Sequence, residues 1–146
     1  MAASTYWYGK ALLQILDKQV DFAADTIKVA LCSSSYTPDQ DAHDFFDDIT
    51  NELATAGGYT AGGATLASCA VTYDAPTNVV KLDAEDVSWA DATFTARYAI
   101  IYDAQTGEAS TSPLIAYVDF GEDKSPSAGT FTIQWHEDGI LTATVS

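Results

Sequence analysis

The sequence predicts a mainly β fold: an antiparallel β-sandwich or barrel-like sheet of about seven or eight strands, with one or two short helices near the N-terminus. Short segments with period-two apolar alternation recur from residue 64 to the end, separated by turn residues. A helical 3.6-residue period occurs only in the first third of the chain. The 146 residues, 47% of them hydrophobic, suffice for one core and contain no interdomain linker, so we expect residues 1–146 to form a single domain.

Two segments have the spacing of amphipathic helices. The first is predicted at roughly residues 9–20, where one apolar stripe is formed by Leu12, Ile15, Leu16 and Val20. The second lies within PDQDAHDFFDDITNEL (38–53) and ends before Gly57-Gly58; its apolar positions are Phe45, Ile49 and Leu53. The first helix should pack on a larger body, because only one of its faces is apolar.

The remaining periodic segments predict strands. They lie at residues 26–32, 66–73, 78–83, 93–103, 113–120, 130–135 and 141–145. Residues 74–77 (DAPT) favour a turn between the second and third of them. His136 to Gly139 should close a C-terminal hairpin with an Asp-Gly turn. Arg97 falls on the polar face of 93–103, where we expect it to pair with an acid.

Charge and cysteine content exclude several classes of protein. The net charge is −15 with only six Lys and Arg, so neither nucleic acid nor an anionic membrane surface is an expected partner. Cys32 and Cys69 have no CxxC spacing, and we expect two ordinary thiols and no zinc site. The N-terminus does not resemble a signal peptide, and no apolar run approaches the roughly 18 residues that span a bilayer.

No catalytic or metal-binding motif is present. The acidic segment 39–52 begins like a calcium loop, but Asp44 occupies the glycine position and Thr50 the position of the bidentate glutamate. We interpret this segment as a solvated helix start, although an irregular cation site there remains an alternative. With 21 acids, a pair of carboxylates has no diagnostic value, and nucleophile, zinc and phosphate-loop motifs do not occur. We therefore expect no enzyme, cofactor or metal.

Two segments are candidates for contact with another protein. Residues 1–9 form a candidate interface arm containing the aromatic residues Tyr6, Trp7 and Tyr8. The glycine-rich segment 57–64 supplies Gly57, Gly58 and Tyr59 as further interface candidates. The alternative for the aromatic residues is that they fasten the first helix to the sheet.

Several segments together resemble a group of small structural proteins of tailed bacteriophages. The resemblance covers most of the chain and is carried by DFAADTIKVALCSSSYTPDQDAHDFFDDI (21–49), GYTAGGATLA (58–67), VKLDAEDVSW (80–89), ATFTARYAIIYD (92–103), PLIAYVDFG (113–121) and FTIQWHEDGILT (131–142). It implies a virion protein, best a head decoration or cement protein that binds the major capsid protein on the outside of the assembled head. It further implies assembly in the host cytoplasm and self-association as trimers or other symmetric clusters.

Two other functions stay open at this point. One is a tail or head-to-tail component, such as a tube or terminator subunit, whose ring would turn the acidic segment toward the DNA channel. The other is a carbohydrate-binding β-sandwich, with Trp89 and Trp135 as the residues that would stack on a sugar.

Overall fold

A computed structural model describes residues 3–146, which are 42% strand and 8% helix, so the predicted mainly β class is confirmed. The larger sheet is antiparallel and has five strands. In spatial order they are β1 (Ser4–Trp7), β8 (Leu114–Lys124), β7 (Ala96–Asp103), β2 (Ile27–Cys32) and β3 (Ala64–Thr65). The predicted interface arm is therefore largely part of this sheet, as an edge strand; residues 1–2 lie outside the described residues.

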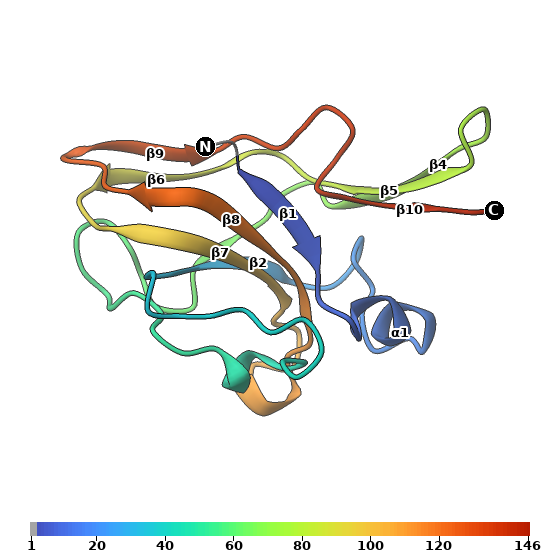
Figure 1. Ribbon diagram of the computed structural model, residues 1–146, viewed down its shortest axis with the longest axis horizontal. Coiled ribbons are helices and arrows are strands. Elements are labelled where there is room, and N and C mark those ends of the chain that lie inside the picture. The colour runs from blue at the N-terminus through green and yellow to red at the C-terminus, as the bar shows by residue number, and fades with distance from the viewer. Residues whose placement is uncertain (1–2) are drawn as a thin grey trace.

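The remaining strands form two smaller antiparallel sheets. One pairs β6 (Val87–Ala92) with β9 (Gly129–Ile133). The other has the order β10 (Leu141–Thr144), β5 (Val79–Asp83) and β4 (Ala70–Asp74). Because β5 continues into β6 and β9 leads to β10, the two sheets are successive sections of one long ribbon. The section formed by β6 and β9 lies beside the five-stranded sheet, whereas the section formed by β10, β5 and β4 projects away from it (Figure 1). We call the latter the projecting sheet.

Two apolar clusters hold these layers together. The larger lies between the five-stranded sheet and the ribbon, and includes Val29, Ile101, Trp89 and Ile133. The smaller cluster, with Tyr36 and Ile100 among its members, lies on the other side of the large sheet under the segment that follows β2. β7 is consequently buried on both faces and does not have the predicted polar face. The expected partner of Arg97 is Asp119, at 2.9 Å between Nε and Oδ1.

Both predicted helices are shorter than expected. The first is α1 (Ala11–Leu16), because Lys18 takes a left-handed φ of 62° and the chain turns there. The second is a single 3₁₀ turn, η1 (Phe46–Asp48); another 3₁₀ turn, η2 (Ala109–Thr111), precedes β8. A longer second helix is prevented because residues 51–53 run alongside β2, with Leu53 N donating to Leu31 O at 2.9 Å.

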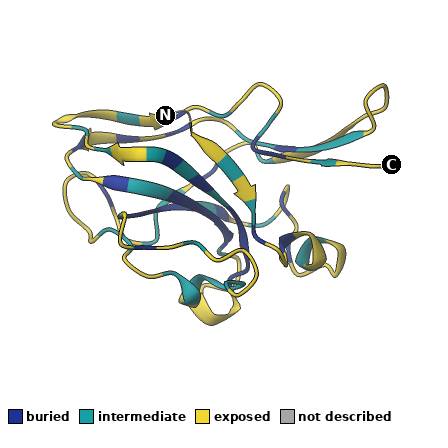
Figure 2. Cartoon of the chain, viewed as in Figure 1, coloured by how far each residue is buried: buried dark blue, intermediate teal, exposed yellow. Residues whose placement is uncertain are grey.

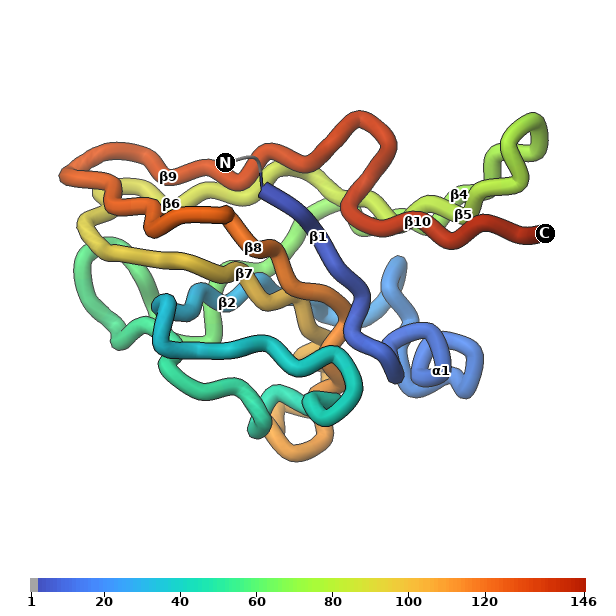
Figure 3. Tube along the Cα trace, viewed as in Figure 1, coloured from blue at the N-terminus to red at the C-terminus, as the bar shows by residue number. Residues whose placement is uncertain are grey.

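The predicted hairpins had opposite outcomes. The turn at 74–77 does join β4 to β5 as adjacent antiparallel strands. The C-terminal hairpin is wrong, because β9 pairs with β6 and β10 pairs with β5, so the chain leaves β9 through a raised loop before it enters β10 (Figure 3). The Asp-Gly turn is present in that loop, where Gly139 has a φ of 97°, but it does not connect paired strands.

Candidate docking surface

Two of the predicted interface residues are in the core. Tyr8 is 1% exposed and Tyr59 is 2% exposed, so neither can contact a partner, and these predictions are wrong. Each ring carries a hydroxyl that finds a buried partner. Tyr8 Oη lies 2.7 Å from Tyr36 Oη, and burial is the main reason that the pKa of Tyr8 is raised.

Tyr59 fastens the loop before β3 to β2. Its hydroxyl donates to Glu52 Oε2 at 2.6 Å and accepts from the backbone N–H of Leu31 at 3.0 Å. Gly62 N also donates to Glu52 Oε2, at 2.5 Å. Burial first, and the hydrogen bond to Glu52 second, raise the pKa of Tyr59. The aromatic residue in this glycine-rich segment is thus structural.

Gly57 and Gly58 are exposed, but their conformation is required by the fold. A Cβ on Gly57 would lie 2.0 Å from Thr93 O, and one on Gly58 would lie 2.5 Å from Ala90 O. Gly57 O also accepts from Thr93 N at 2.8 Å. The pair therefore forms a tight turn against the β6–β7 connection. No atom of β1 is among the nearest neighbours of Gly57 or Gly58. The two predicted interface segments, residues 1–9 and 57–64, therefore belong to different parts of the fold.

Tyr6 and Trp7 remain accessible. Tyr6 stacks on Tyr117 of β8 with 5.1 Å between ring centroids, and its outer surface is exposed. Trp7 is half-buried, and its Nε1 donates to Thr142 O of β10 at 3.1 Å. Trp7 thereby links the large sheet to the projecting sheet, whereas the alternative interpretation had these aromatic residues fasten the first helix to the sheet.

An apolar groove of about 670 Å³ lies between α1 and the projecting sheet β10-β5-β4. Leu12, Ile15 and Leu16 line it from the helix, and Val71, Val80 and Ala143 line it from the sheet. Trp7 lies between the two walls, and Val145 extends the sheet wall toward the C-terminus. We call this feature the α1 groove.

The side chains of the α1 groove are unusually exposed for apolar residues. Leu16 is 75% exposed, and Leu12, Val71 and Val145 are each about half exposed. Figure 2 shows the same region, α1 and the far end of the projecting sheet, mostly in the colours of exposed and intermediate residues. Contiguous exposed apolar surface of this kind marks interaction sites in folded proteins.

The projecting sheet is amphipathic, which explains why it lines a groove. Cross-strand register places Val71 opposite Leu82 and Tyr73 opposite Val80, and the same two β5 residues face Leu141 and Ala143 of β10. All of these lie on one face because directly opposed residues point to the same side. The other face carries Thr72, Asp74, Lys81 and Thr142, and it bounds a separate polar depression.

The acidic segment 39–52 uses its carboxylates to cap backbone N–H groups. Asp39 Oδ1 accepts from Asp41 N and Ala42 N, which lowers the pKa of Asp39. Asp48 Oδ2 accepts from Asp44 N and Phe45 N, and these bonds likewise lower the pKa of Asp48. Across residues 3–146 no group of three or more His, Cys, Asp or Glu could hold one metal ion.

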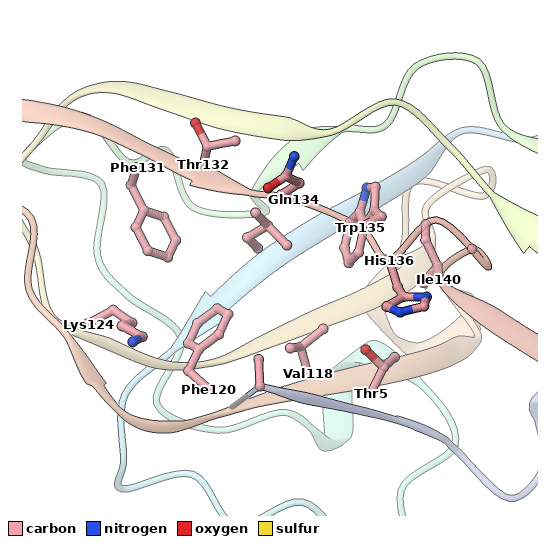
Figure 4. A pocket seen from close by; sticks show the side chains of 13 residues that line it. Thr5, Val118, Phe120, Lys124, Phe131, Thr132, Gln134, Trp135, His136 and Ile140 are labelled. Carbon is pink, nitrogen blue, oxygen red and sulfur yellow. The ribbon is translucent and has the colours of Figure 1, made fainter. Parts of the chain in front are cut away.

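A second hollow, of about 360 Å³, lies between β8 and β9 (Figure 4). Phe120, Phe131 and Trp135 line it, with Lys124 and His136 toward its two ends. Trp135 Nε1 donates to Glu85 O at 3.0 Å, so this ring is held in place. Trp89 is only 6% exposed and belongs to the core, so it cannot stack on a sugar.

Other reactive groups are inaccessible or locally engaged. Cys32 is buried, which raises the pKa of its thiol to about 12, and it forms no disulfide with the half-buried Cys69. Asp103 is the carboxyl whose pKa rises furthest, to about 7, because of burial and the adjacent Asp25 carboxyl. Asp103 is 1% exposed, so a substrate could not reach it.

No family model matches the chain, and no curated protein or solved structure is significantly similar to it. In the part of the chain that is described, no helix is long and apolar enough to cross a membrane.

Proposed function

We propose that this chain is a non-enzymatic structural protein of a tailed-phage virion, and that it decorates and stabilises the assembled head by docking through the α1 groove. The observation that carries the proposal is the groove itself, because Leu12, Leu16 and Val71 are left open to solvent on a molecule with a net charge of −15. The sequence resemblance to small phage structural proteins supplies the partner: an apolar edge or segment of the major capsid protein.

The charge supports a place outside the head. A protein with −15 net charge is repelled by packaged DNA and stays soluble while free, in spite of its exposed apolar groove. Since the binding surface for a decoration protein exists only on the assembled shell, binding stabilises that state by mass action. Clusters such as trimers at the symmetry axes of the shell are consistent with this role.

The test is addition of the purified protein to expanded, undecorated heads, with occupancy measured by sedimentation of the particles. Leu16→Glu introduces a charge into the groove at an exposed position and should leave folding within about 0.5 kcal/mol of the wild type. We expect occupancy to fall by on the order of tenfold or more, because the charge would be buried at the contact without a partner.

The matched control is Leu13→Glu. Leu13 is on the same helix and is 62% exposed, but it does not line the groove, so the same change of charge should leave occupancy unchanged. If both variants bind like the wild type, the groove is not the docking surface. If wild-type protein binds only tails or necks, or forms closed rings in solution, the tube or terminator alternative is correct.

A further inference from the structure

We propose that two copies of this chain pair through their β4 strands, antiparallel about a two-fold axis at Thr72, so that the two projecting sheets become one six-stranded sheet. This pairing does not depend on the capsid proposal. It uses the free edge of the projecting sheet, whereas docking uses the α1 groove beside it.

β4 is an edge strand that lacks three of the usual protections against pairing: a bulge, a lysine and a proline. Within residues 3–146 it has β5 on one side and no strand on the other, and all five of its residues are exposed. Its register with β5 runs without a bulge, and its sequence AVTYD contains neither Lys nor Pro. Natural edge strands are blunted by such devices, and a strand that lacks them is a template for another strand. The opposite edge differs, because Trp7 donates to Thr142 O of β10.

The β4 sequence is self-complementary in one register. An antiparallel pair centred on Thr72 brings all five residues into the ladder and keeps apolar side chains on one face. Val71 then lies opposite Tyr73 of the second copy, and Thr72 lies opposite its own equivalent. β-branched residues beside aromatic residues, and Thr beside Thr, are favourable cross-strand pairs. A shift by one residue would mix the two faces of the sheet.

The same register makes the apolar face continuous across both copies. Within one chain the row runs from Leu141 through Leu82 to Val71, and a second row runs from Ala143 through Val80 to Tyr73. At the seam, the first row of one copy would meet the second row of the other. Each row would then contain six apolar residues without a polar interruption.

The polar face supplies charge complementarity at the seam. Lys81 lies in the central row, beside Thr72, while Asp74 and Asp83 lie in the two outer rows. Asp74 of one copy would be opposite the uncharged Ala70 of the other, so no like charges face each other directly. The two central lysines would lie between the outer rows of acids, which reduces the repulsion that a net charge of −15 imposes on each copy.

A seam of five residues is small, so the dimer should be weak and reversible. Its affinity should rise with salt, because the remaining long-range repulsion is screened once the Debye length falls to about 4 Å at about 0.5 M NaCl. Sedimentation equilibrium of the wild-type chain should therefore show a mass that rises from 15.5 kDa toward twice that value with concentration and with salt.

The discriminating variant is Thr72→Lys, which places two like charges directly opposite each other across the proposed seam. The new charge also lies opposite Lys81 of the same chain, but that repulsion is present in monomer and dimer alike. Thr72 is exposed and points away from the α1 groove, so docking to heads should not change. The added charge opposite Lys81 should lower the free energy of unfolding by no more than about 1 kcal/mol. Thr144→Lys is the matched control, since it adds the same charge on the β10 edge of the same sheet. We expect loss of the dimer in Thr72→Lys and its retention in Thr144→Lys.

Cross-linking tests the register. In a Cys69→Ser background, Thr72→Cys should form a covalent dimer with a short bis-maleimide, while Thr144→Cys should not. The proposal is overturned if the wild type is monomeric at high concentration and high salt, if it forms trimers, or if the two cysteine variants cross-link equally. Head binding by Thr72→Lys is a separate readout, so failure of the dimer and failure of the decoration role are distinguishable.

Discussion

Asp103 offers a prediction whose size and sign follow from the structure. Its Oδ1 accepts from Gln105 N at 2.9 Å, but its Oδ2 is buried beside the Asp25 carboxyl and has no donor among the described residues. Burial and this neighbour raise the pKa to about 7, from an ordinary value of 3.8. The folded protein therefore keeps a proton at Asp103 over a pH range in which the unfolded chain has already released it.

This difference fixes the direction of the pH dependence. Between the two pKa values the unfolded state binds fewer protons than the folded state, so the contribution of Asp103 to stability is fully present below pH 3.8 and is lost as the pH rises to about 7. A rise of the pKa from 3.8 to about 7 corresponds to a loss of about 4 kcal/mol in the free energy of unfolding. Asp103→Asn keeps an acceptor oxygen and cannot ionise, so it should remove this loss.

The assay is urea unfolding, followed by tryptophan fluorescence, of the wild type and Asp103→Asn across this pH range. Acids that do not interact with Asp103 contribute equally to both proteins and cancel in the difference, whereas the adjacent Asp25 carboxyl is part of the measured change. We expect the variant to gain about 4 kcal/mol on the wild type between pH 4 and pH 8. A difference that stays constant with pH would refute the reasoning, because it would mean that Asp103 titrates alike in both states.

Asp119→Asn is a control of opposite sign. Burial works to raise the pKa of Asp119, but hydrogen bonds from Arg97 and Gly121 N outweigh it and leave the pKa lowered. Its stabilising contribution is present at neutral pH and is lost as the pH falls through the folded pKa. The wild type should therefore lose its advantage over Asp119→Asn on acidification, not on alkalinisation.

Two further predictions concern the loops that cover the large sheet, and both are measured by urea unfolding. Gly63→Ala should destabilise the protein by about 3 kcal/mol or more, because its Cβ would lie 1.8 Å from Val29 O at a φ of +83°. The control is Gly107→Ala, which has a φ of +77° but open space around it and should destabilise the protein by only about 1 kcal/mol. Equal losses of stability in the two variants would contradict the predicted clash. Tyr59→Phe should lower the free energy of unfolding by about 1–3 kcal/mol, because it leaves the buried N–H of Leu31 without an acceptor. The control is Tyr73→Phe, which removes an exposed hydrogen bond and should stay within about 0.5 kcal/mol of the wild type.

The elements that the sequence predicted correctly are those determined by local pattern. Alternation located β2 and β7, a segment that is apolar on both faces located β8, and the DAPT turn located the β4–β5 hairpin. The C-terminal hairpin failed because partner choice is not local: β10 pairs with β5, whose residues lie about 60 positions earlier. The predicted length of the first helix was wrong for a related reason. The helix ends before Lys18, whose left-handed conformation lets Val20 and Phe22 enter the core.

The candidate site was harder to predict than the fold. Tyr8 and Tyr59 look like interface residues in the sequence, and only the structure reveals the buried groups that satisfy their hydroxyls. The groove residues were visible as apolar positions, with Leu12 and Leu16 on the predicted helix and Val71 and Val80 on predicted strands. Their spacing predicts that each stripe needs a partner surface, but it contains no information on whether the two stripes close on each other or stay apart.

Binding through the α1 groove and pairing through the β4 edge can be distinguished by their dependence on salt concentration. The α1 groove and the β4 edge share Val71, and both expose apolar side chains on a strongly acidic protein. Screening removes the repulsion between two like copies, so pairing through β4 should strengthen with salt. A partner that holds the acidic protein partly through basic residues would instead be weakened by salt. The sign of the salt dependence of head binding therefore reports whether apolar contact or opposite charge dominates that interface.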